Sequence, residues 1–66
     1  MTTSEIRTQV GEIRLSYWLG NIDAANTKSQ LQSINWASVS SDPEISIQLM
    51  QDIVNDTITQ LDNGTL

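Results

Sequence analysis

Cysteine, histidine and phenylalanine are absent from this sequence of 66 residues, and lysine occurs once. Without cysteine or histidine, neither a disulfide nor a zinc site can hold the fold together. The same absences remove the usual nucleophile–base pairs, because a catalytic serine or cysteine generally needs a histidine beside it. Three widely separated glycines form no phosphate-binding loop. We therefore expect no enzyme, no cofactor and no metal site.

Positive charge is also scarce, because three lysines and arginines stand against eight aspartates and glutamates. The formal net charge of −5 and the isoelectric point near 4.1 argue against direct binding of nucleic acid or of an anionic membrane. Long apolar runs are missing as well, and the polar start of the chain has no signal-peptide core. We therefore expect a cytoplasmic protein with no membrane segment.

A chain of 66 residues has room for one domain, over 1–66, with a thin hydrophobic core. Domains this short bury only about 60% of the surface that the unfolded chain exposes, and they are marginally stable alone. With disulfides and zinc sites excluded, self-association is the remaining common way to bury more area. We expect a homo-oligomer.

The last third of the chain predicts an amphipathic helix over 43–62. Asp42 is the expected N-cap, Pro43 suits the first helical position, and Asn63 and Gly64 are typical of a helix end. Between these ends apolar residues recur on one face: Ile47, Met50, Val54, Ile58 and Leu61.

A first helix is expected over about 4–19, capped by Thr3 or Ser4 and ended by Gly20. One face is marked by apolar residues at spacings of four, three and four: Ile6, Val10, Ile13 and Tyr17. A second apolar face points roughly the opposite way and is formed by Leu15, Trp18 and Leu19. A helix with two apolar faces needs two packing partners. Gly11 shares that second face, where its missing side chain could admit another backbone. The alternative is that this glycine is merely tolerated, at a cost of about 1 kcal/mol relative to alanine in a helix interior.

The middle of the chain is less clearly patterned. A helix over 23–37, capped by Asp23 or by Thr27, is favoured, although its polar residues are only moderate helix formers. The alternative is a short extended piece over 32–39, where apolar and polar residues alternate. A lone strand has no partner elsewhere in the chain, so the helix is preferred. The expected fold is all-α, a bundle of two to three helices over about 4–19, 23–37 and 43–62, completed by oligomerisation.

Surplus apolar residues mark a candidate interaction surface, made of Leu15, Trp18, Leu19 and Trp36. Trp36 either folds back onto the core or serves as an anchor for a partner. Asp52 and Asp56 form a candidate acidic face, since they lie four residues apart on the polar side of the last helix.

Arg7 and Arg14 leave one route to a small anionic ligand open, because they lie one heptad apart on the first helix. Copies of both arginines would converge in a symmetric oligomer. The alternative is that each arginine pairs with a neighbouring acid such as Glu12.

These observations favour a non-enzymatic interaction protein, a helical homo-oligomer that regulates, inhibits or scaffolds another protein. The alternative is an acidic inhibitor of a nucleic-acid-binding protein, as in small viral or mobile-element proteins. It depends on the unopposed carboxylates of the last helix, and five acids are few for mimicry of DNA.

Overall fold

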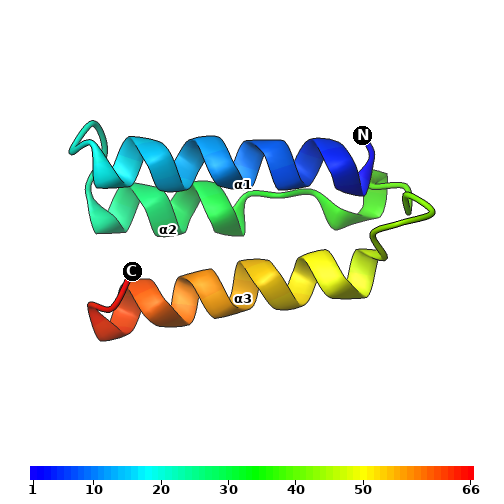
Figure 1. The fold of residues 1–66 in the computed structure, drawn as a ribbon. Coiled ribbons are helices and arrows are strands. Elements are labelled where there is room, and N and C mark those ends of the chain that lie inside the picture. The colour runs from blue at the N-terminus through cyan, green and yellow to red at the C-terminus, as the bar shows by residue number, and fades with distance from the viewer.

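Three α-helices and one short 3-10 turn make up the chain, and the computed structural model describes all residues, 1–66. The helices are α1 (Thr3–Trp18), α2 (Ala24–Gln32) and α3 (Ile47–Asn63), and the turn is η1 (Trp36–Ser38). α1 and α3 run in the same direction, while α2 and the segment after it run back along them (Figure 1). The predicted all-α bundle is confirmed, with three helices and no strand.

The ends of α1 and the end of α3 lie close to their predicted positions. Thr2 is the N-cap of α1, just before the expected pair of candidates, and it forms a reciprocal capping box with Glu5. Gly20 follows α1 with φ of 79°, and Gly64 closes α3 with φ of 71°. Both values lie in the left-handed region that glycine adopts without strain, so both glycines end their helices as predicted.

α2 is shorter than the helix predicted over 23–37. Asp23 is its N-cap, accepting a hydrogen bond of 2.8 Å from the amide of Asn26, but the helix ends at Gln32. The prediction is therefore wrong for the C-terminal part of this range. Serine and asparagine there compete for backbone hydrogen bonds and favour turns over a continued helix.

The segment after α2 is held by the core and by the N-terminus of the chain. Val39 is buried, and Trp36 is half-buried against the same core. Ser40 pairs with the start of the chain, because its amide donates to the carbonyl of Met1 at 2.7 Å and its carbonyl accepts from the amide of Thr3 at 3.0 Å. This single parallel bridge lies at Ser40, just beyond the alternative extended piece over 32–39, which forms no strand.

α3 begins later than predicted, at Ile47 and not at residue 43. Its N-cap is Ser46, whose hydroxyl accepts a hydrogen bond of 3.0 Å from an amide of the first turn. Asp42 is engaged elsewhere, since its carboxylate accepts from the amide of Glu44 at 3.0 Å in a local turn. The prediction of Asp42 as the helix cap is wrong for this reason.

Thr3 fixes the position of this turn against α1. Its hydroxyl donates to the carbonyl of Ile45 at 2.7 Å and accepts from the amide of Asp42 at 2.9 Å. The Thr3 side chain is fully buried, so these bonds satisfy backbone groups that have little access to water. The start of α1 and the approach to α3 are thereby joined.

The core lies between the three helices and is thin. Ten of the 66 residues are buried, in a molecule 33 Å long and 18–19 Å across. The apolar part of this core contains Ile6, Val10, Leu31, Val39, Met50, Val54 and Leu61. The buried polar residues are Thr3, Thr27 and Thr57. So small a core leaves much apolar surface outside it.

Candidate functional site

An apolar cluster of Leu15, Trp18 and Leu19 covers the C-terminal end of α1. These side chains are 54%, 56% and 66% exposed, because α1 packs on α2 and α3 through its opposite face only. The sequence predicts a second packing partner for this side of the helix, and no helix of the same chain provides it. The apolar cluster is the largest group of exposed apolar side chains on one element.

Trp36 does not belong to this cluster. It lies in η1, which occupies the other end of the molecule from the end of α1 (Figure 1). Its ring packs against the core and is half-buried. The four residues predicted as one interaction surface are therefore divided between the two ends of the bundle.

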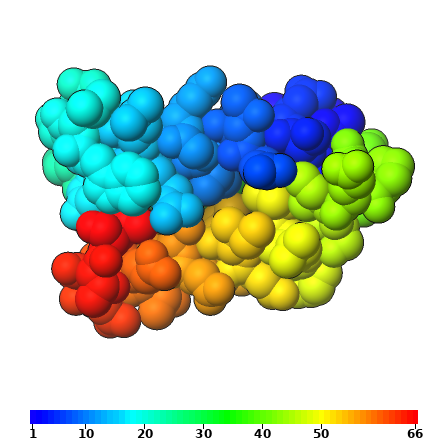
Figure 2. Space-filling view, viewed as in Figure 1, coloured from blue at the N-terminus to red at the C-terminus, as the bar shows by residue number.

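A hollow of about 290 Å³ lies on the outer seam between α1 and α3, and we refer to it as the α1–α3 hollow. Figure 2 looks onto this seam, with α1 in blue to cyan and α3 in yellow to red. The hollow is lined by Arg7, Val10, Gly11, Arg14, Met50 and Ile53. A Cβ atom built on Gly11 would meet nothing within 4 Å, so the glycine faces open space within this chain. No backbone of the same chain uses the close approach that its missing side chain permits.

The two arginines of the hollow have no acidic partner in the chain. The only ion pair joins Lys28 of α2 to Asp62 of α3 at 3.1 Å, and the alternative pairing of an arginine with Glu12 is not formed. The guanidinium of Arg14 lies 5.2 Å from the centre of the Trp18 ring, a cation–π contact. Its Nε atom is covered and has no hydrogen-bond acceptor.

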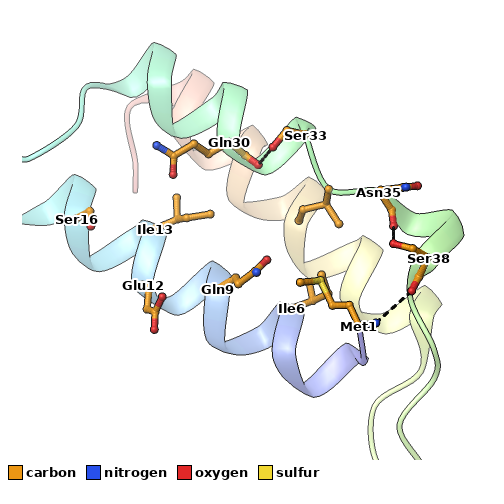
Figure 3. A pocket seen from close by; sticks show the side chains of 11 residues that line it. Met1, Ile6, Gln9, Glu12, Ile13, Ser16, Gln30, Ser33, Asn35 and Ser38 are labelled. Atoms are coloured by element: carbon orange, nitrogen blue, oxygen red, sulfur yellow. Dashed lines mark hydrogen bonds between the residues drawn. The ribbon is translucent and has the colours of Figure 1, made fainter.

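A larger polar groove of about 590 Å³ opens between α1 and the segment that follows α2 (Figure 3). It exists because α2 ends early and leaves part of α1 uncovered by a helix. The lining side chains are mostly amides and hydroxyls: Met1, Ile6, Gln9, Glu12, Ile13, Ser16, Gln30, Ser33, Ile34, Asn35 and Ser38. Glu12 is the one charged side chain among them, and none of them is a nucleophile beside a base. No sequence pattern predicts this groove, because it depends on where α2 stops.

Asp52 and Asp56 are both exposed on α3, as the sequence predicts for its polar side. The side-chain amide of Gln48 donates to Asp52 at 2.9 Å, and Asp56 forms no ion pair. Nowhere in the molecule do three acidic side chains gather in a group that could hold a metal ion. The acidic face is therefore a pair of separate carboxylates.

No family model, curated protein or solved structure matches this chain. None of its helices has the length and apolar character needed to cross a bilayer. Function must be inferred from the surfaces described above, of which the apolar cluster and the α1–α3 hollow adjoin each other through the contact of Arg14 with Trp18.

Proposed function

We propose that this protein is a non-enzymatic interaction module, a small helical homo-oligomer that regulates, inhibits or scaffolds another protein. The observation that carries the proposal is the exposure of Leu15, Trp18 and Leu19 side by side on α1. Leaving apolar area in water forgoes roughly 25 cal/mol for each Å² that a partner would cover. Large exposed apolar patches on small proteins commonly mark protein–protein contacts.

The acidic face gives less support to the alternative of mimicking a nucleic acid. Mimicry of DNA requires negative charges at the close, regular spacing of phosphates. Asp62 is paired with Lys28, and Asp42 and Glu44 lie in the connecting segment, away from the exposed pair on α3. We therefore restrict the proposal to an interaction protein that docks through apolar side chains.

Self-association is tested by light scattering after size-exclusion chromatography, over a wide range of protein concentration. We expect a mass that is a multiple of the 7.3 kDa chain and a melting temperature that rises with concentration. A monomer that melts cooperatively at the same temperature at every concentration would refute the homo-oligomer.

Contact with another protein is tested with the double variant Leu15→Gln, Leu19→Gln. Both side chains are more than half exposed, so the variant should keep the helical circular dichroism and the melting temperature of the natural chain within a few degrees. We expect a protein that the natural chain retains from a lysate of its native cell to be lost from the variant, as measured by quantitative mass spectrometry.

Ala37→Gln is the matched control, because Ala37 is exposed in η1, at the other end of the molecule from the apolar cluster. This control should retain the same protein as the natural chain. If the double variant and the natural chain retain identical proteins in equal amounts, the apolar cluster is not the docking surface.

A further inference from the structure

We infer that the α1–α3 hollow is the surface on which a second copy of this chain docks, about a twofold axis parallel to the helices. In this arrangement each Arg14 pairs with Asp56 of the other copy. The inference depends on the homo-oligomer of the proposed function and specifies the interface through which it forms.

Arg14 has no acidic partner in its own chain. It forms no ion pair, and its Nε atom is covered without an acceptor. Glu12, the acid nearest in sequence, lines the polar groove on the other flank of α1. The guanidinium lines the α1–α3 hollow and meets no acid of its own chain, so a carboxylate of a second copy docked there can pair with it through the nitrogens other than Nε.

Arg14 and Asp56 lie at similar heights along the bundle axis. Gly11 of α1 and Ile53 of α3 line the same hollow, and the two helices run in the same direction. Arg14 follows Gly11 by three residues, and Asp56 follows Ile53 by three residues. With the same rise per residue in both helices, Arg14 and Asp56 lie at nearly the same height.

Because Arg14 and Asp56 share a height, a twofold axis parallel to the helices would form two ion pairs between the copies. It places α1 of one copy over α3 of the other without a shift along the bundle, so each Arg14 meets Asp56 of the other copy. A twofold axis across the helices would instead place α1 on α1 and bring the arginines of both copies together. Like charges disfavour that second arrangement.

The apolar side chains on the same seam complete the interface. Ile53 lines the hollow and is half-buried, and Leu49, one turn before it on α3, is 47% exposed, so both have area left to cover. The open space at Gly11 of the facing α1 would receive such side chains, and the missing Cβ allows the two helices to approach closely. A second copy supplies both the carboxylate and the apolar side chains that the hollow lacks. Leu15 lies one turn after Gly11 and borders this interface, whereas Leu19 lies farther along the chain and farther around the helix axis and stays free for another protein.

The test is the exchange of the two charges, measured as the dimer dissociation constant by sedimentation equilibrium. Arg14→Asp or Asp56→Arg alone places like charges opposite each other and should raise the dissociation constant about tenfold or more. The double variant Arg14→Asp, Asp56→Arg restores opposite charges and should bring the constant back to within about threefold of the natural value.

Glu12→Arg is the matched control, since it makes the same change of net charge as Asp56→Arg but lies in the polar groove. It should leave the dissociation constant within about threefold of the natural value. Gly11→Leu is a second probe, because a Cβ atom at this position meets nothing of the same chain within 4 Å, and circular dichroism of the variant checks that its fold is kept. It should raise the dissociation constant about tenfold by holding the helices apart.

The outcomes separate the two proposals. An oligomer whose dissociation constant is unchanged by the single charge reversals or by Gly11→Leu overturns the inferred interface and leaves the proposed function standing. A double variant that fails to recover also overturns the pairing of Arg14 with Asp56. A chain that is monomeric at every concentration contradicts the inferred interface and the proposed homo-oligomer together.

Discussion

Buried threonines are the polar residues of this core, and each uses its hydroxyl on the backbone. Thr27 donates to the carbonyl of Asp23 at 2.8 Å, and Thr57 donates to that of Ile53 at 2.9 Å, both within one helical turn. Thr3 differs because both of its partners lie in the segment before α3. The first two threonines satisfy their buried hydroxyls within their own helices, whereas Thr3 connects two segments that are far apart in the sequence.

We expect Thr3→Val to lower the free energy of unfolding by about 1–3 kcal/mol. Valine keeps the shape of the side chain but leaves the carbonyl of Ile45 and the amide of Asp42 without their partner. Urea unfolding at one fixed protein concentration, followed by circular dichroism, measures the loss.

Thr3→Ser is the control for this prediction, since serine retains the hydroxyl and loses only a methyl group. It should lower the free energy of unfolding only by the value of one buried methyl group, about 1 kcal/mol, and therefore by less than Thr3→Val. Equal losses in the two variants would mean that the hydrogen bonds of Thr3 contribute nothing beyond packing.

No sequence pattern predicts this role of Thr3, because local signals mark the residue only as a candidate helix cap. The partners of the hydroxyl are 39 and 42 residues away, and no local pattern connects them. The contact of Arg14 with Trp18 is different, because residues four apart on a helix are neighbours. The sequence did not determine whether Arg14 pairs with a neighbouring acid or contacts the Trp18 ring.

At the scale of the elements, the start of α3 shows how two capping signals compete. Asp42-Pro43-Glu44 has the residue types of a helix start, and Ser46 is a second cap nearby. The structure uses Ser46, because the backbone of residues 42–45 is bound to Thr3 and cannot join the helix.

We expect Ser46→Ala to lower the free energy of unfolding by about 1 kcal/mol, since the amide of Leu49 loses its acceptor. Ser46→Gly should cost only a few tenths of a kcal/mol, because glycine is tolerated at the cap position. Thermal and urea unfolding of the two variants, beside the natural chain, measure both effects.

Ser40→Ala is the matched control for the cap, because Ser40 is exposed and bonds through its backbone, which alanine retains. It should change stability by less than about 0.5 kcal/mol. If Ser46→Ala were as mild as this control, the start of α3 would not depend on the Ser46 hydroxyl.

The helices themselves were predictable to different degrees. α1 and α3 have long apolar periodicity and a glycine at the end, so their type and C-terminal limits followed from local physics. α2 lacks such periodicity, and its end at Gln32 depends on where Trp36 and Val39 reach the core. The polar groove was unpredictable for the same reason. The apolar cluster was predictable at its α1 residues, because the second face of that helix is visible in the sequence.

At the scale of the whole molecule, the distance between the two tryptophans decides which surfaces can act together. Trp18 and Trp36 lie at opposite ends of the bundle, because η1 follows a segment that returns along α1 (Figure 1). Spacing along the chain cannot place them, since it does not say how far α2 extends. α1 and α3 run in the same direction because of that returning segment. The shared height of Arg14 and Asp56 depends on this parallel course.

Charge also acts at this scale, because a net charge of −5 on a small molecule opposes its folding. The one ion pair, between Lys28 and Asp62, is exposed and should contribute at most about 1 kcal/mol. Salt screens the repulsion among the remaining acids more than it weakens this pair. We therefore expect the midpoint of urea unfolding to rise between about 0.05 M and about 0.5 M sodium chloride, at a protein concentration low enough for dissociated chains.

The double variant Glu44→Gln, Asp52→Asn identifies the cause of this rise. It removes two exposed acids, so the net charge changes from −5 to −5 + 2 = −3 and less repulsion is left to screen. Its unfolding midpoint should start higher at low salt and increase less as sodium chloride is added. A midpoint that falls with salt in the natural chain would instead mean that attractive pairs, such as Lys28 with Asp62, outweigh the excess of acids.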